Sequence, residues 1–319
     1  MTEISPVPGD SYSAVATHDL TVKYPDGGGI TDISLIFGAG RTAIVGNNGA
    51  GKSTLLETIA GLREPSSGNV ELFGRTPVSW RAEGIHQVAI ALQDGRPYPS
   101  ARPQAFLEYL RKLYATDQNH DSVRDVNVLL DAFALRTTTM IKNLSGGELQ
   151  RLKCAAALIA DTPILILDEP TAGLDPQGRR DLYALLASVV PAKRTTLIST
   201  HILEDLESIG GRVIALAKGS VVFDSDSNPV TSAFHMSFAS RVNLQLEPLR
   251  NALAEDVTIA ERAQGRYQVR SENPIDAALI STVMNFCAQI GAEVSDVHVS
   301  ERGGVLAQVE GLLLEGGDS

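Results

Sequence analysis

One short loop sequence places the strongest constraint on how this chain folds. Residues 46–54 read GNNGAGKST and match the phosphate-binding pattern G-x-x-x-x-G-K-[ST]. Glycines allow backbone N–H groups to point at phosphate oxygens, and the positive end of a following helix strengthens the attraction. The apolar run at 42–45 and the helical spacing over 53–62 predict the strand–loop–helix setting that the pattern requires. A nucleotide-binding α/β domain is therefore favoured over a glycine-rich turn without a ligand.

The side chains of this loop have distinct expected roles. Lys52 is long enough to reach the β- and γ-phosphates, and the Ser53 hydroxyl is suited to ligate Mg²⁺. The residues expected to surround the phosphates are Gly46, Asn47, Asn48, Gly49, Ala50, Gly51, Lys52, Ser53 and Thr54.

A second motif supplies acidic groups. Residues 163–170 read PILILDEP, and four consecutive branched aliphatic residues predict a buried parallel strand. Open α/β sheets bind ligands at the carboxyl ends of their strands, where this motif places Asp168 and Glu169. Asp168 is expected to hold Mg²⁺, and Glu169 to orient or deprotonate an attacking water. The alternative, an acidic strand end that simply faces solvent, is disfavoured because the chain also carries a phosphate loop.

Two further strand ends carry polar side chains. Gln93 follows a predicted strand at 86–92, and His201 follows another at 195–199. A single histidine after a strand is more often structural than catalytic. The position of His201 one strand beyond the acidic pair reverses that expectation, because an imidazole there is suited to donate to a γ-phosphate oxygen.

A third glycine-containing segment precedes a helical pattern. Residues 144–148 read LSGGE, and a helical insert of about 50 residues separates them from Gln93. The Ser145 hydroxyl and the N–H groups of Gly146 and Gly147 can cradle an anion at the start of a helix. Taken alone, this segment also fits an ordinary helix cap.

The order of the predicted elements divides the chain into parts. Strand patterns at 15–23 and 33–37 precede the phosphate loop and predict a β-rich flank on an α/β core. The parts we expect are a disordered tail at 1–13, a nucleotide-binding domain at 14–228 with a helical subdomain at about 94–160, a linker at 229–240 and a C-terminal domain at 241–319.

The C-terminal segment has an element order of its own. Strand and helix patterns follow one another at 242–247, 248–254, 257–261, 266–270, 275–290 and 294–299, with a last helix expected at 305–314. This order is βαββαβ, the split βαβ arrangement, and predicts a small α+β domain. No catalytic constellation occurs in it, so a regulatory or interaction domain and a packing appendage both stay open.

Composition limits the partners and the compartment. The formal net charge of −11 argues against a nucleic-acid backbone as partner, because such binding relies on Lys and Arg. The two cysteines, Cys154 and Cys287, lack the spacing of a disulfide framework or a zinc site, which favours a reducing cytosol. The chain contains no run of 18 apolar residues, and its first residues lack the pattern of a signal peptide.

Taken together, the motifs occur in one specific order. The order is Tyr24 at a strand end, GNNGAGKST, Gln93, a helical insert, LSGGE, ILILDEP, AGLD and His201. It resembles the nucleotide-binding subunit of an ATP-binding cassette (ABC) transporter over residues 14 to about 228. The resemblance implies an α/β fold: a P-loop NTPase core of ABC ATPase type with an antiparallel β flank and a helical subdomain.

The resemblance implies roles for residues within one chain. Tyr24 would stack on the adenine of ATP, and residues 46–54 would wrap its phosphates. The implied catalytic residues are Lys52, Gln93, Glu169 and His201, and the implied Mg²⁺ ligands are Ser53, Gln93 and Asp168. Glu169 would be the base, and His201 would contact the γ-phosphate.

The resemblance also implies partners. Ser145, Gly146 and Gly147 would bind the γ-phosphate of an opposite subunit, and Asp175 would lie at the dimer interface. A second ATPase subunit, identical or homologous, would then form a head-to-tail dimer that encloses two ATP molecules. Separate integral membrane permease subunits would hold this dimer at the cytoplasmic face of the cell membrane.

Weaker features concern the branch of the family. Residues 154–158 read CAAAL, where many importers have an arginine near Ala156, and 172–175 read AGLD. Both look like the exporter-type (ABC-2) branch, which exports drugs, antimicrobial peptides, lipids or polymers. The alternatives are a soluble ABC ATPase without a transport role and a regulator that binds nucleotide without hydrolysis. The single cassette opposes the first alternative, and the intact catalytic set opposes the second.

Overall fold

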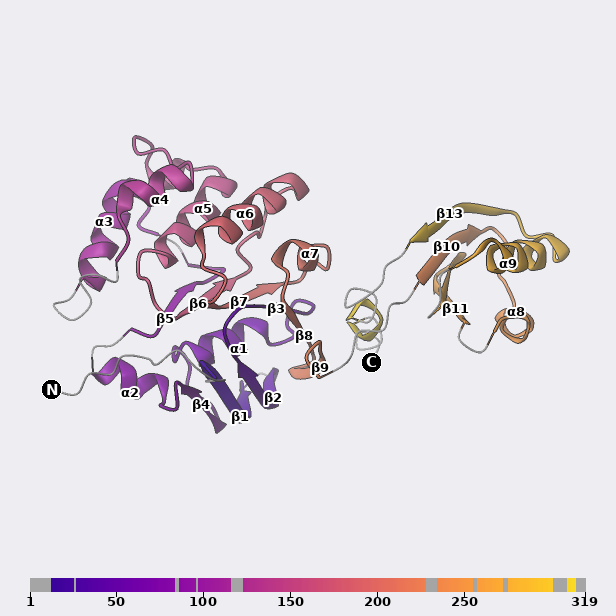
Figure 1. Cartoon of the computed structure of the whole chain (residues 1–319), viewed down its shortest axis with the longest axis horizontal. Coiled ribbons are helices and arrows are strands. Elements are labelled where there is room, and N and C mark those ends of the chain that lie inside the picture. Colours follow the sequence, from indigo (N-terminus) through magenta and orange to yellow (C-terminus); the bar gives the residue numbers. More distant parts are fainter. Residues whose placement is uncertain are drawn as a thin grey trace. The chain divides into compact units, whose positions relative to one another are not determined.

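The computed structural model forms two compact units (Figure 1). One comprises Met1–Asp226 with Leu313–Ser319, and the other comprises Ser227–Leu312. The residues that the structure describes are 13–25, 27–83, 86–95, 97–115, 123–227, 234–254, 257–271, 275–300 and 309–313. The predicted tail therefore lies almost wholly outside the described residues.

A six-stranded sheet is the centre of the first unit. Its strand order is β5-β6-β7-β3-β8-β9, parallel except for the last pair. The strands are β3 (Arg41–Val45), β5 (Val88–Ala91), β6 (Ile164–Asp168), β7 (Thr195–Thr200), β8 (Arg212–Ala217) and β9 (Ser220–Asp224). Every residue of β6 and β7 is buried, as expected for the interior of a parallel sheet. The carboxyl ends of β3, β5, β6 and β7 meet at one edge, which places the predicted catalytic segments together.

A smaller antiparallel sheet flanks this core. Its order is β2-β1-β4, formed by β1 (Val15–Lys23), β2 (Gly29–Phe37) and β4 (Ser67–Leu72), with α2 (Pro77–Ala82) following β4. Helix α1 (Lys52–Ile59) lies between the two sheets (Figure 1). Leu55, Leu56 and Ile59 of α1 are fully buried and belong to one apolar cluster with residues of both sheets. This cluster fixes the start of α1, and hence the phosphate loop, between the two sheets.

Short helices make up the rest of the first unit. They are α3 (Pro103–Tyr114), α4 (Val126–Ala132), α5 (Gly146–Ala157), α6 (Pro176–Val189) and α7 (Asp205–Ile209). Helix α4 is shorter than the pattern at 122–135 predicts, because Asp125 caps it by accepting from the N–H groups of Asn127 and Val128. It ends before Ala134, whose φ is +48°. No helix among the described residues is long and apolar enough to cross a membrane.

The second unit has the predicted βαββαβ order. It contains β10 (Phe234–Ser240), α8 (Leu246–Ala252), β11 (Val257–Ala263), β12 (Arg266–Ser271), α9 (Ala277–Gln289) and β13 (Val294–Ser300). The strands pair antiparallel in the order β11-β12-β10-β13. Met236, Phe238, Tyr267, Val283 and Cys287 belong to its core. Residues 309–313 are helical, within the predicted last helix.

The first strand of this unit lies earlier than predicted. The predicted linker at 229–240 contains β10, and the predicted strand at 242–247 is a loop followed by the start of α8. Met236 and Phe238 alternate into the core at 0% and 2% exposure, whereas Val242 is 44% exposed. The Ser240 hydroxyl donates to Val242 O and accepts from Val242 N, and this local turn ends the strand.

We therefore expect Phe238→Ala to destabilise the second unit by about 3–5 kcal/mol, because it removes a large side chain from a packed core. The exposed control Val242→Ala should change its stability by less than about 0.5 kcal/mol. Hydrogen exchange of the β10 and β12 amides measures both effects. Equal protection in the two variants would contradict the assignment of β10 to the core.

Candidate nucleotide-binding and hydrolysis site

The phosphate loop is closely packed at its two outer glycines. A Cβ atom on Gly46 would lie 2.4 Å from Leu216 O, and one on Gly51 would lie 2.6 Å from Ile30 Cγ2. Gly51 also has a φ of +101°, in the left-handed region that favours glycine. Helix α1 begins at Lys52 without a side-chain cap, so its first N–H groups are available to phosphate oxygens.

Lys52 is buried and bound on two sides. It is 5% exposed, and its Nζ donates to Gly46 O at 2.9 Å and to Asn47 O at 3.3 Å. The same Nζ lies 3.2 Å from Glu169 Oε1. The lysine therefore joins its own loop to the end of β6.

Three of the predicted catalytic side chains, Lys52, Gln93 and His201, converge on the fourth, Glu169. Besides Lys52 on Oε1, Glu169 Oε2 accepts from Gln93 Nε2 at 3.2 Å and lies 3.1 Å from His201 Nδ1. Glu169 itself is 5% exposed. Its φ of +46° is uncommon for a non-glycine residue, and such backbone conformations concentrate at functional sites. Gln93, Glu169 and His201 follow the ends of β5, β6 and β7, and Lys52 is the first residue of α1, after the phosphate loop.

Asp168, the last residue of β6, precedes Glu169 and is hydrogen-bonded to Ser199 of β7. Burial raises the pKa of the Asp168 carboxyl above its usual value, and the Glu169 carboxylate acts in the same direction. Hydrogen bonds from Ser199 and Ser53 and the Lys52 ammonium oppose this rise in the pKa. The Ser199 hydroxyl donates to Asp168 Oδ1 at 2.5 Å and accepts from Glu169 N at 2.8 Å. Sequence reasoning missed Ser199, whose pairing opposite Asp168 appears only in the strand register.

The oxygen atoms at this point fit a magnesium ion. No group of three or more His, Cys, Asp or Glu side chains that could hold a metal occurs in the described part of the chain. Asp168 and Ser53 instead offer one carboxylate and one hydroxyl. Mg²⁺ takes few protein ligands and completes its shell with phosphate oxygens and water. The donor set therefore fits Mg²⁺.

The predicted adenine platform lies at the end of β1. The Tyr24 hydroxyl is hydrogen-bonded to Thr54 Oγ1 at 3.0 Å, which ties the ring to α1. The Arg63 guanidinium carbon lies 4.9 Å from the centre of the Tyr24 ring, and Arg63 also donates to Glu57. This cation–π contact fixes the ring orientation, and no sequence motif marks Arg63.

The LSGGE segment forms a complete helix cap. Ser145 precedes α5; its hydroxyl accepts from Glu148 N at 3.3 Å, and Ser145 N donates to Glu148 Oε2 at 2.9 Å. The hydrogen bond from Ser145 N lowers the pKa of the Glu148 carboxyl. Ser145 and Gly146 are exposed, and Gly147 is partly exposed.

Asp175 has a similar capping role. It caps α6 by accepting from Gly178 N at 2.7 Å. Among the described residues, no hydrogen bond joins Ser145 or Asp175 to the phosphate loop of the same chain. The predicted site residues therefore form two groups, one gathered at Glu169 and one exposed elsewhere on the unit.

Comparisons with known proteins identify the family. The profile of the family described as ABC transporter matches residues 30–172. The Nod factor export ATP-binding protein I of Cupriavidus metallidurans is 32% identical over 245 residues, which cover 74% of this chain and 79% of that protein. The chain belongs to the ATP-binding subunits of ABC transporters. The energy-coupling factor transporter ATP-binding protein EcfA2 of Streptococcus pneumoniae is 31% identical and covers 65% of this ABC subunit and 80% of its own length.

Solved structures share the fold of this ABC subunit. An ATP-binding subunit of an ABC transporter matches with a TM-score of 0.58 at 25% identity, over 67% of this chain and 91% of that one. The protein cbiO1 from Clostridium perfringens, part of the ABC transporter complex cbiONQ, matches with a TM-score of 0.56 at 25% identity, over 66% and 88%. The predicted family and fold class are thus confirmed, and the chain is an ABC-type ATPase.

The raised pKa of Asp168 gives a pH-dependent stability that Asp168→Asn should remove. A carboxyl whose pKa is higher in the folded state stabilises the fold below its unfolded pKa of about 3.9, and this contribution is lost as pH rises through the folded pKa. The melting temperature of the nucleotide-free variant should therefore exceed that of the wild type increasingly across this window, by about 2–4 °C for each kcal/mol. A difference that is constant with pH would contradict the raised pKa.

Proposed function

We propose that this ABC ATPase powers export through separately encoded membrane subunits, as one half of a dimer that encloses two ATP molecules. The observation that carries the proposal is the convergence of Lys52, Gln93 and His201 on Glu169, together with the exposure of Ser145 on the same unit. Export is favoured because the Nod factor export protein aligns over 74% of this chain, against 65% for EcfA2. The proposed cargo is a drug, an antimicrobial peptide, a lipid or a polymer, as in the exporter-type branch.

Each residue at the sheet edge has a role in hydrolysis. Tyr24 stacks on adenine, and the N–H groups at the start of α1 hold the phosphates. When ATP binds, the Lys52 ammonium exchanges its contact with Glu169 for contacts with the β- and γ-phosphates. Glu169 then accepts a proton from the attacking water, and His201 donates to a γ-phosphate oxygen.

Ser53, Asp168 and Gln93 would hold Mg²⁺. When bound, this ion neutralises charge that develops on the phosphate oxygens. Asp168 is suited to this role because it is 4% exposed and the Ser199 hydroxyl fixes the orientation of its carboxylate. Gln93 reaches the same place from the end of β5, where its amide already contacts Glu169.

The second group of residues serves a neighbouring subunit. The exposed start of α5, at Ser145, Gly146 and Gly147, presents N–H groups that suit a γ-phosphate. The Ser145–Glu148 cap already fixes the orientation of this helix start. Asp175, at the start of α6, lies at the same interface. In a symmetric pair, each subunit completes the site of the other.

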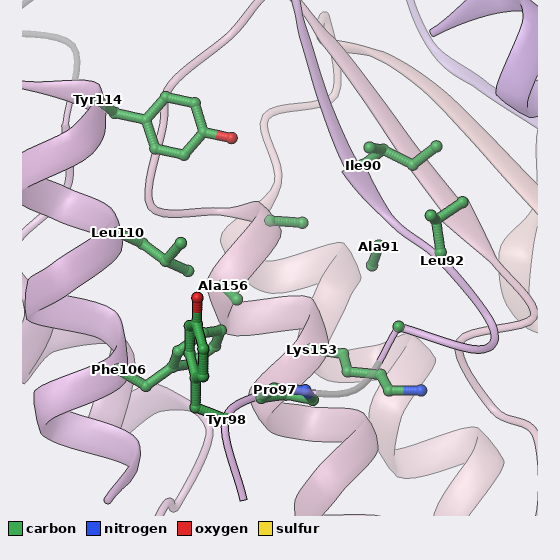
Figure 2. A pocket seen from close by; sticks show the side chains of 12 residues that line it. Ile90, Ala91, Leu92, Pro97, Tyr98, Phe106, Leu110, Tyr114, Lys153 and Ala156 are labelled. Atoms are coloured by element: carbon green, nitrogen blue, oxygen red, sulfur yellow. The ribbon is translucent and has the colours of Figure 1, made fainter. Parts of the chain in front are cut away.

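A cleft beside Gln93 is the proposed contact with the membrane subunits. It measures about 260 Å³ and lies between β5, α3 and α5 (Figure 2). Its aromatic wall includes Tyr98, Phe106 and Tyr114, and Tyr98 is 64% exposed. The lining residue Lys153 donates to Gln93 O at 2.6 Å. A short apolar segment of a permease in this cleft would therefore contact the segment that carries Gln93 and hold the subunit at the cytoplasmic face of the membrane.

Glu169→Gln is the direct test of the proposed chemistry. An amide of equal size keeps the shape of this side chain and one acceptor oxygen, but it does not accept the proton of water. ATP binding should persist, turnover should fall at least about 100-fold, and ATP should trap a dimer. The exposed control Glu207→Gln on α7 should hydrolyse ATP normally. Hydrolysis by Glu169→Gln at the wild-type rate would show that Glu169 is not the base.

Mixing two inactive variants tests the shared site. Ser145→Arg subunits lack a working LSGGE segment, and Lys52→Ala subunits lack a working phosphate loop. In a head-to-tail heterodimer, one site combines the two intact halves, so the mixture should regain about a quarter of the wild-type ATPase rate if the subunits pair at random. A mixture as inactive as its components would contradict a site built from two chains, and full activity would contradict it as well.

A further inference from the structure

One buried carboxylate of the first unit makes no contact with the residues assigned to ATP. Asp205, the first residue of α7, is 3% exposed. Its Oδ2 accepts from Thr171 Oγ1 at 3.1 Å, from Tyr183 OH at 3.1 Å and from Thr200 Oγ1 at 3.3 Å. Its Oδ1 accepts from Arg179 Nε at 2.9 Å. All four donors are side chains, and they come from the loop after β6, from α6 and from the end of β7.

Two of these donors lie close in sequence to proposed catalytic residues. Thr171 follows Glu169 in the loop after β6. Thr200 ends β7 and immediately precedes His201. The relative position of Glu169 and His201 therefore depends on two segments that are both bonded to Asp205.

The other two donors lie on α6. Arg179 and Tyr183 are on this helix, which begins after its cap Asp175. Burial raises the pKa of the Tyr183 hydroxyl, so this group stays protonated and donates. Asp205 is thus also bonded to the helix whose start faces the proposed neighbouring subunit.

We propose that Asp205 is a positioning residue for ATP hydrolysis, which holds the loops of Glu169 and His201 in register with the start of α6. The inference rests on the proposed roles of Glu169, His201 and Asp175. A buried carboxylate needs all of its donors, because an unmatched charge in a low-dielectric interior is costly. A shift of one loop therefore weakens the bonds that hold the others. A change at the subunit interface would reach the catalytic carboxylate by this route.

The chain offers a matched control for a purely structural role. Asp224 on β9 is 8% exposed and accepts from the Arg212 guanidinium at 2.8 and 2.5 Å. Like Asp205, it is a buried carboxylate paired with an arginine, and the same Asp→Asn change removes its charge. Its ion pair with Arg212 joins β9 to β8 and involves none of the loops that carry Glu169, Asp175 or His201.

The test compares Asp205→Asn with Asp224→Asn in the full chain. Both variants should melt at a lower temperature than the wild type. Asp205→Asn should lower kcat about 10- to 100-fold with the KM for ATP changed less than about threefold, because misplacement by about 1 Å costs catalysis on this scale. Asp224→Asn should keep the wild-type kcat and KM. A wild-type kcat in folded Asp205→Asn, or equal losses in both variants, would overturn the proposal.

A milder variant decides the question if Asp205→Asn does not fold. Tyr183→Phe removes one donor and keeps the Arg179–Asp205 ion pair. Its kcat should fall about two- to fivefold at an unchanged KM, and an unchanged kcat would overturn the proposal. Wild-type turnover by Glu169→Gln would instead show that the catalytic assignment is wrong, so the two failures are distinguishable.

Discussion

The buried ion pair between Lys52 and Glu169 is the interaction on which the rest of the site depends. Both residues are 5% exposed, and their charged atoms are 3.2 Å apart. Such a pair is stable only if the remaining hydrogen-bonding capacity of both groups is used. The Lys52 ammonium also donates to two carbonyl oxygens of the phosphate loop, and the Glu169 carboxylate also contacts Gln93 and His201. A phosphate that attracts Lys52 therefore also changes the environment of the proposed base.

The sequence predicts most of this site because its motifs follow strands of one parallel sheet. Apolar runs such as 164–167 predict buried strands, and the polar residues that follow parallel strands meet at the carboxyl edge of the sheet. The phosphate loop adds a backbone requirement that only a few sequences meet. Pattern and spacing place Lys52, Glu169 and His201 at this edge, and the family resemblance adds Gln93, although neither gives the contacts among them.

The features that sequence reasoning missed depend on contacts between distant segments. The sequence predicts a linker where β10 lies, because polar and turn-forming residues precede this segment, whereas 242–247 alternates as a strand does. The Ser240 turn and the burial of Phe238 against Tyr267, at 5.4 Å between ring centres, decide otherwise. Asp205 follows Glu204 and precedes Glu207, so its surroundings in sequence suggest an exposed acidic helix start. Its burial follows from Arg179 and Tyr183 on another helix.

The end of β7 connects the contacts around Glu169 with the contacts around Asp205. Three consecutive residues there contact three different carboxylates: Ser199 bonds Asp168, Thr200 bonds Asp205, and His201 contacts Glu169. Successive side chains of a strand point to opposite faces, so Ser199 and Thr200 reach opposite sides of the sheet. The strand is fully buried and paired on both sides, and it cannot shift one of these side chains alone. A displacement of α6 or α7 that moves Asp205 therefore acts on Thr200, and through the next peptide on the imidazole that contacts the proposed base.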